Sequence, residues 1–212
     1  QGNLFFDAMP VARLYAPNLT RITATATDAQ LDRAIRQGIG LDGRPLLTMP
    51  SGQFQYLRGG EVAALIVAMR QIPPQGGAMP PHELGPLGRV GLVIGKFQTA
   101  PTLVAEHAAH RPPDFGDAFA KGRHLVETSC TECHGALLQG REVRPGTFAP
   151  DLLVVAAYEP ESFHVMLRTG VAVGNRPLGV MAEMAKSKFS HLRDDEIDAL
   201  LGYLKERVRR GK

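Results

Sequence analysis

Two cysteines and an adjoining histidine are the residues whose types and spacing most directly indicate chemistry. They occur in the string Cys130-Thr131-Glu132-Cys133-His134, and the 212-residue chain has no other cysteine. The C-x-x-C-H order is typical of covalent attachment of c-type haem. Two thiols at this spacing can reach the two vinyl groups on one edge of a porphyrin, and the imidazole that follows can bind the iron. The string therefore predicts haem c attached through Cys130 and Cys133, with His134 as an axial ligand.

Other uses of a C-x-x-C pair fit the surrounding sequence less well. A thioredoxin-like redox pair is expected inside a βαβ pattern, whereas the residues on both sides here look helical. A structural zinc site needs two further Cys or His residues at matched spacing, and none is evident in the sequence. Haem attachment is therefore the favoured interpretation.

The second axial ligand is expected downstream of the motif, where five side chains are candidates: His164, Met166, Met181, Met184 and His191. We expect Met166 to pack in the core, inside a helix over 160–168. Met181 and Met184 fall in a segment that reads as a loop, from which a ligand can cross to the far face of a haem. A methionine ligand would raise the reduction potential. Bis-histidine ligation through His164 or His191 is the alternative.

The chain repeats itself at an offset of about 132 residues. The string Ala16-Pro17-Asn18-Leu19 recurs as Ala149-Pro150-Asp151-Leu152. At an offset of 132, five residues coincide in type with five others: Arg36, Gly38, Arg44, Pro45 and Leu46 with Arg168, Gly170, Arg176, Pro177 and Leu178. At an offset of 135, four more pairs are identical, Phe54, Leu57, Glu61 and Leu65 with Phe189, Leu192, Glu196 and Leu200, and Arg70 falls on Lys205. The sequence thus contains two versions of one module.

The repeat also bears on the choice of methionine and on a first haem. Pairing Met49 with Met184 keeps the pattern Met-x4-Phe-x2-Leu whole, which favours Met184 over Met181. Run backwards at an offset of 133, the repeat places the counterpart of His134 at Gln1. We therefore expect an N-terminally incomplete first module whose C-x-x-C lies upstream of the printed chain, with Met49 as the axial ligand of a first haem. The alternative is a module that never carried haem.

Over residues 115–207 the sequence resembles a class I cytochrome c domain, with C-x-x-C-H, a Pro-Asp-Leu segment, a methionine segment and a C-terminal helix. The whole chain is similar to the diheme or multi-haem periplasmic cytochromes c that serve bacterial dehydrogenases as electron-transfer subunits or partners. The resemblance implies that the carbonyl of Pro150 accepts a hydrogen bond from His134. It also implies that Gly122 packs against the C-terminal helix near Tyr203. The chain departs from the family pattern by lacking a first C-x-x-C-H.

We expect an all-α fold of two cytochrome c-like helical modules, 1–73 and 115–212, joined by a long Pro- and Gly-rich linker at 74–114. An apolar island at 90–94 is expected to be buried as the linker wraps along the modules. In the second module, four residues follow the i, i+3, i+4, i+7 stripe of a helix: Ile197, Leu200, Leu201 and Leu204. Arg168 and Arg176 are candidates to meet haem propionates, with a plain surface role as the alternative.

Composition narrows the class of protein. The chain has 24 Lys and Arg residues against 21 Asp and Glu, and a net charge of +3 is too mild to indicate nucleic-acid binding. No apolar run approaches the roughly 18 residues of a membrane span. Membrane association is therefore expected only through partners or a segment outside the printed chain.

Together these features predict an electron carrier rather than an enzyme. Electrons would pass between a periplasmic or membrane dehydrogenase and a respiratory acceptor such as an oxidase, in the periplasm or at the periplasmic face of the inner membrane. A haem enzyme or gas sensor with a labile sixth ligand is one alternative. A structural subunit of a redox complex is another.

Overall fold

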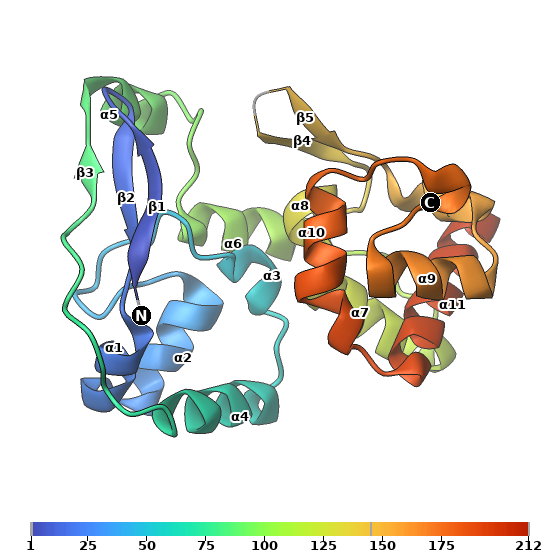
Figure 1. Ribbon diagram of the computed structural model, residues 1–212, viewed down its shortest axis with the longest axis horizontal. Helices are drawn as coiled ribbons and strands as arrows, with labels where there is room; N and C mark the ends of the chain where they lie inside the picture. Colours follow the sequence, from blue (N-terminus) through green and yellow to red (C-terminus); the bar gives the residue numbers. More distant parts are fainter. Residues whose placement is uncertain (1, 145, 212) are drawn as a thin grey trace. The chain divides into compact units, whose positions relative to one another are not determined.

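The computed structural model describes residues 2–144 and 146–211 (Figure 1). The chain forms two compact units, Gln1–Ala109 and His110–Lys212. Each unit has its own apolar core. The two are described separately below.

Four short helices form the core of the first unit: α1 (Leu19–Thr25), α2 (Asp28–Gln37), α3 (Ser51–Phe54) and α4 (Gly59–Arg70). α2 begins at a capping box formed by Thr27 and Gln30 and ends at Gly38, which has a left-handed backbone with φ of +69°. Five buried apolar residues make up the core cluster: Ala26, Leu31, Ile35, Val62 and Ile66. α2 and α4 therefore meet through their apolar faces.

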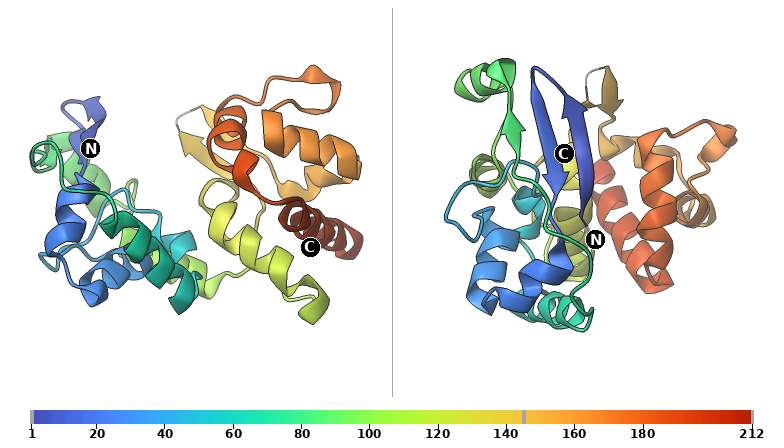
Figure 2. Two further views of the ribbon diagram at one scale, coloured as in Figure 1. Left: turned by 60° about the horizontal axis from the view of Figure 1, so that its bottom comes forward. Right: turned by 60° about the vertical axis from the view of Figure 1, so that its left-hand side comes forward.

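A small antiparallel sheet, of order β1-β2-β3, lies beside these helices. Its strands are β1 (Asn3–Ala8), β2 (Ala12–Ala16) and β3 (Glu83–Leu84). The β1–β2 hairpin extends from α1 to α5 (Pro86–Val93), as Figures 1 and 2 show. The carbonyl oxygen of Pro10, at the hairpin turn, lies so close to Gly85 that a β carbon there would be 2.0 Å away.

The segment expected as a linker contributes elements to the first unit. Besides β3 and α5, it contains α6 (Ala100–Ala109), which packs against α3. The side chain of Gln55 donates a hydrogen bond to the carbonyl of Val104, 3.0 Å away. The compact unit thus continues to Ala109, and residues 83–109 are folded onto it.

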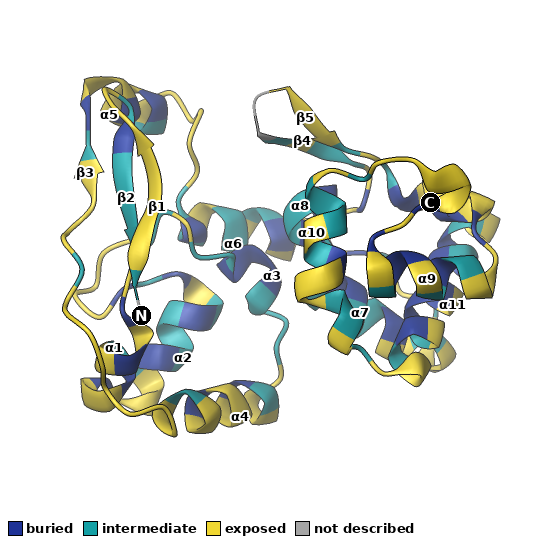
Figure 3. Ribbon diagram, in the orientation of Figure 1, coloured by how far each residue is buried: buried dark blue, intermediate teal, exposed yellow. Residues whose placement is uncertain are grey.

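The expectation of a buried island at 90–94 is wrong. Val93 is 87% exposed, and Val90 and Ile94 are also exposed (Figure 3). α5 instead buries its glycines, because Gly88 packs on the backbone of Val11 and Gly91 on the ring of Phe97. These two contacts leave no room for a β carbon, so the buried face of α5 consists of glycines. The apolar side chains of Val90 and Val93 lie on the exposed face.

The second unit is built from helices and one hairpin. Along the chain its elements are η1 (Asp117–Phe119), α7 (Ala120–Ser129), α8 (Thr131–His134), β4 (Arg141–Arg144), β5 (Thr147–Ala149), η2 (Leu152–Ala157), α9 (Pro160–Thr169), η3 (Val173–Asn175), α10 (Val180–Ser187), η4 (Phe189–His191) and α11 (Asp194–Arg210). The longest helix, α11, packs against α7, α9 and η2. Its four stripe residues, Ile197, Leu200, Leu201 and Leu204, are all buried. This confirms the helix expected there.

The fold is mostly helical but not purely all-α, so that expectation is corrected. Both units contain a β-hairpin. All six residues of β1 are exposed. Because neither face of the strand is buried, its sequence need not alternate between apolar and polar residues, which is the pattern that reveals a strand. The segment 170–190, expected as a loop, also contains a helix, α10.

Several elements occur at repeated positions in the two units. α9 and α2 have the same length at an offset of 132, and each ends at a left-handed glycine, Gly170 and Gly38. α11 and α4 begin at an offset of 135. The hairpins also correspond, because Asn3 pairs with Ala16 as Arg141 pairs with Ala149.

The hairpin correspondence shifts the alignment at the start of the first unit. Gly2 packs against the carbonyl of Ala16 and the amide of Asn18, as Gly140 packs against those of Ala149 and Asp151. Gly2 therefore corresponds to Gly140 and not to Gly135. Gln1, which the sequence aligned with His134, lies outside the described residues.

Candidate haem site

α8 is a single helical turn that carries the C-x-x-C-H string. The amide of Cys130 donates to the carbonyl of Val126 at 2.9 Å, and the amide of His134 to that of Cys130 at 3.0 Å. Because residues three apart in a helix share a face, Cys130 and Cys133 lie on the same side of the turn, and both are half-buried. This spacing suits two thioether bonds to one edge of a porphyrin.

The environment of Cys130 argues against a reactive dithiol. Burial, with Cys133 beside it, raises the pKa of the Cys130 thiol to about 12. Thioredoxin-like cysteines need a lowered pKa, because the thiolate is the reactive form. Nor does the described part of the chain hold any group of three or more His, Cys, Asp or Glu residues suited to a metal ion. The environment of Cys130 therefore does not favour the thioredoxin-like alternative.

His134 is held in the orientation that an axial ligand needs. Its residue is 8% exposed, and its Nδ1 lies 2.8 Å from the carbonyl oxygen of Pro150, the contact expected from the family resemblance. Nδ1 donates this bond because a carbonyl can only accept, which leaves Nε2 unprotonated for a metal. Burial lowers the pKa of His134, against the opposing effects of Pro150 and Asp151. This shift favours the neutral imidazole, which is the form that metal ligation requires.

The turn that carries Pro150 is fastened to α11 by an ion pair. Nη1 of Arg207 lies 2.7 Å from a carboxylate oxygen of Asp151. That oxygen also accepts a hydrogen bond from the amide of Leu153 at 2.8 Å, so Asp151 caps the start of η2. Burial would raise the pKa of Asp151, but the hydrogen bonds from Arg207 and Leu153 hold it below its ordinary value.

The sequence analysis did not identify Arg207 as a site residue. The structure buries it. A signal did exist, because Arg207 follows Leu200 and Leu204 by seven and three residues and so lies on the apolar stripe of α11. A charged residue at such a position needs a partner.

The two candidate methionines lie three residues apart on α10, and both are half-buried. Met181 packs against the main apolar cluster of the unit, which Cys130 also contacts. Met184 lies outside that cluster. The two side chains therefore have different surroundings, although the repeat alone favoured Met184.

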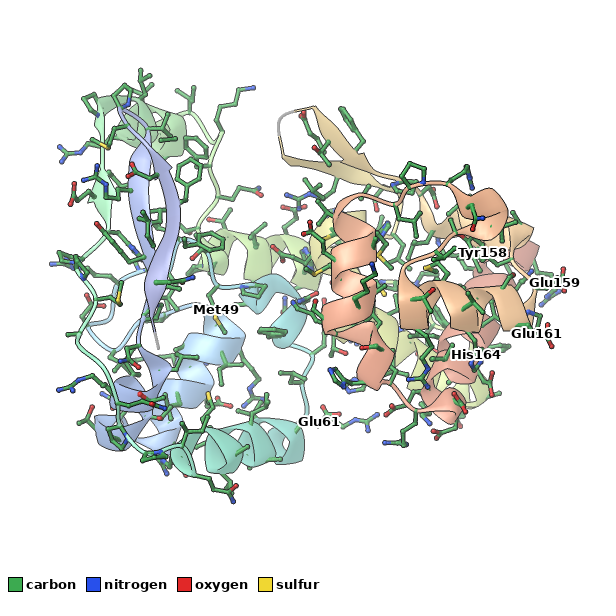
Figure 4. All side chains as sticks on the ribbon, viewed as in Figure 1. Met49, Glu61, Tyr158, Glu159, Glu161 and His164 are labelled. Atoms are coloured by element: carbon green, nitrogen blue, oxygen red, sulfur yellow. The ribbon has the colours of Figure 1, made fainter. Side chains whose placement is uncertain are left out.

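The remaining candidates have local structural roles. Met166 is buried in the core, as expected from the sequence. His164 on α9, labelled in Figure 4, has its Nε2 2.8 Å from Asp198 of α11. His191 is exposed in η4. Neither histidine has surroundings that single it out as a ligand.

The two arginines expected near propionates differ in their surroundings. Arg168 donates to the carbonyl of Ser190 at 2.5 Å and to the carboxylate of Asp194 at 2.8 Å. These bonds tie the end of α9 to the start of α11. Arg176 is exposed after η3.

In the first unit, Met49 precedes α3 and packs against the core cluster of that unit (Figure 4). Its carbonyl accepts the amide of Ser51 at 2.8 Å. The position corresponds in sequence to α10 of the second unit, where the candidate methionines lie.

The residues of the second unit fit a c-type haem. The paired thiols, the oriented imidazole and a methionine packed on the same apolar cluster are the groups that such a cofactor requires. When bound, haem iron supplies a one-electron couple between its ferrous and ferric states. The chain itself contributes the attachment, the orientation of His134 and the apolar surroundings.

Comparison with known proteins defines the class of this unit. Residues 119–207 match the cytochrome c family. The chain thus contains a cytochrome c domain, with covalently bound haem c, and the match supports electron transfer through haem.

One relative extends the comparison over both units. The chain is 24% identical over 226 aligned residues to the fructose dehydrogenase cytochrome subunit of Gluconobacter japonicus. The alignment covers 92% of this chain and 45% of the relative, so the chain spans less than half the length of that protein. In the described ranges no helix is both long and apolar enough to cross a membrane.

Proposed function

We propose that the second unit is an electron carrier with His134 and a methionine as the axial ligands of its haem. The observation that carries the proposal is the hydrogen bond from Nδ1 of His134 to the carbonyl of Pro150. It presents Nε2 next to two thiols spaced for attachment. Outer-sphere transfer needs no bound substrate, only a haem whose ligation stays the same in both oxidation states.

For the sixth ligand we propose Met181, with Met184 as the alternative. The packing of Met181 against the cluster that Cys130 contacts supports this choice. The repeat supports Met184, because that methionine aligns with Met49. Methionine is a neutral ligand, and with histidine it gives the raised potential of an electron-transfer cytochrome c.

We further propose that the first unit is a second haem module, with Met49 as its axial methionine. The shared positions of α2 and α9, of α4 and α11, and of the two hairpins support a common architecture. The correspondence of Gly2 with Gly140 puts the counterpart of His134 six residues ahead of Gly2. On this proposal the haem-binding cysteines of the first module lie outside the printed sequence.

The proposed setting is a dehydrogenase complex on the periplasmic side of the inner membrane. The relative is a cytochrome subunit of a dehydrogenase, and c-type haem attachment in the resembled family takes place outside the cytoplasm. Electrons would enter from the dehydrogenase and leave to a respiratory acceptor such as an oxidase.

Substrate-driven reduction of the haem tests this function. Membranes and periplasm containing the natural full-length protein are supplied with sugars, beginning with fructose, while the haem c absorption is followed. We expect haem reduction that decreases in the Cys130→Ser, Cys133→Ser double variant. Absence of any redox change during dehydrogenase turnover would instead indicate a structural subunit.

A further inference from the structure

We propose that Asp151 and Arg207 form a charge pair that positions the ligand His134 and sets the reduction potential of its haem. The inference rests on the proposed axial role of His134 and assigns two positioning residues to it. Neither residue binds the iron in this account. Each acts through the Pro150 carbonyl and through its own charge.

Arg207 forms hydrogen bonds to two segments of the chain, one before and one after the β4–β5 hairpin. Its Nη1 donates to Asp151 at 2.7 Å, and its Nη2 donates to the carbonyl of Leu137 at 3.3 Å. Leu137 follows the C-x-x-C-H string by three residues, whereas Asp151 adjoins Pro150. One guanidinium therefore ties the segment that bears His134 to the segment that accepts its hydrogen bond.

The pair has unequal exposure to solvent. The side chain of Arg207 is 4% exposed and that of Asp151 is 35% exposed. A buried guanidinium depends on its partner, because removal of the carboxylate leaves a charge without compensation. Asp151 follows Pro150, which accepts the hydrogen bond of His134, and Arg207 is paired with Asp151, so the two charges would act on the iron with opposite signs. A negative charge favours ferric iron and a positive charge favours ferrous iron.

The first unit shows a neutral version of the same junction. At the position of Asp151 it has Asn18, whose Nδ2 donates to the carbonyls of Gln75 at 2.7 Å and Gly77 at 3.0 Å. Asn18 is also buried. In the first unit, the residue at the position of Asp151 thus holds the turn after the hairpin to the segment that follows α4 through a neutral side chain. An Asp–Arg pair is therefore not required to hold such a turn, which points to a use of its charges in the second unit.

Reduction potentials of the holoprotein test the pair. In Asp151→Asn the unpaired positive charge should raise the potential of the haem attached at Cys130 and Cys133. In Arg207→Gln the unpaired negative charge should lower it. The double variant should return close to wild type. Arg209→Gln is the matched control, because it removes the same charge from an exposed position on α11 and should shift the potential less than Arg207→Gln.

A merely structural role predicts a different pattern. If the pair only held the two segments together, the loss of either residue would expose the haem to solvent in a similar way. The reduction potential would then shift with the same sign in Asp151→Asn and Arg207→Gln, and this result would overturn the proposal. Shifts no larger than that of Arg209→Gln would overturn it as well. Retained haem and an unchanged Met–iron absorption band in these variants would show that the proposed function stands even when the pair does not.

The charge-conserving variants Asp151→Glu and Arg207→Lys keep the proposal testable if a neutral variant loses its haem. The pair predicts potentials near wild type in both, together with faster solvent exchange of the Nδ1 proton of His134, measured by NMR. Unchanged exchange in both variants would overturn the positioning role.

Discussion

Gly122 of α7 lies against the carbonyl oxygen of Ala199 on α11, so closely that a β carbon at Gly122 would be 2.1 Å from that oxygen. Tyr203, one helical turn beyond Ala199, is fully buried beside the same crossing and donates a hydrogen bond to the carbonyl of Pro113 at 2.8 Å. The crossing fixes α7, and α7 leads directly into the turn that carries the haem-binding string. Helix packing and site geometry are therefore coupled.

Gly122→Ala should destabilise the second unit by about 3 kcal/mol, because backbone must move to admit the methyl group. Gly202→Ala on α11 is the matched control. No heavy atom lies within 4 Å of a β carbon at Gly202, and alanine there should stabilise the helix by up to about 1 kcal/mol. Chemical denaturation of the two holoproteins measures both values. Equal effects would show that the helices do not cross as described.

Glu127→Gln should also destabilise the second unit, by roughly 2 kcal/mol, because it removes a buried carboxylate that is paired with two arginines through charge-assisted contacts. The Glu127 side chain is 4% exposed and lies 2.8 Å from Arg111 and 3.3 Å from Arg123. Asp195→Asn, at the exposed ion pair with Lys121, should cost no more than about 1 kcal/mol. Thermal or chemical unfolding distinguishes the two, and a cost at Glu127 as small as that at Asp195 would contradict the buried role.

The stability of α11 should depend on pH through Glu206. Hydrogen bonds from Arg209 and then Arg210 lower the pKa of Glu206 to about 2, below the value of about 4.3 expected in the unfolded chain. A depressed pKa stabilises the folded state above the unfolded value and loses that effect as the pH falls toward 2. The stability difference between wild type and Glu206→Gln should therefore shrink between about pH 4.3 and pH 2. A difference that stays constant over this range would refute the assignment.

Single replacements of the two methionines should identify the sixth ligand. The near-infrared charge-transfer band of ferric Met–iron coordination should disappear in Met181→Ala and persist in Met184→Ala. Met166→Ala, at a core position, serves as a control that perturbs packing without removing a ligand. Loss of the band in Met184→Ala alone would instead support the assignment from the repeat.

A second haem would show itself when the visible attachment site is removed. The natural full-length protein carrying Cys130→Ser and Cys133→Ser should still contain covalent haem. Adding Met49→Ala should then diminish the remaining near-infrared band. A band of unchanged size would contradict a haem ligated by Met49.

The parts of the fold that sequence predicted are those with local signals. C-x-x-C-H is contiguous, and the apolar stripe of α11 has a helical period. The repeat related the segments of α2 and α9 because Arg36 and Gly38 match Arg168 and Gly170, and in the structure both glycines are left-handed and follow the ends of these helices.

The features that sequence did not predict depend on distant residues or on backbone. The ion pair of Asp151 with Arg207 joins residues 56 positions apart, which no local pattern encodes. The exposed strand β1 is held by its backbone pairing with β2, so its side chains carry no periodic signal. α10 was not predicted, because Gly170, Gly174 and Pro177, which precede it, indicated a loop.

Optical redox titration of the purified holoprotein, with carbon monoxide added to the reduced form, tests the central claim most directly. The account predicts a reversible one-electron transition, a near-infrared Met–iron band in the oxidised protein, and no binding of carbon monoxide to the haem at Cys130 and Cys133. Absence of that band together with rapid binding of carbon monoxide would contradict the account, because it would reveal an open or labile sixth position suited to a haem enzyme or a gas sensor.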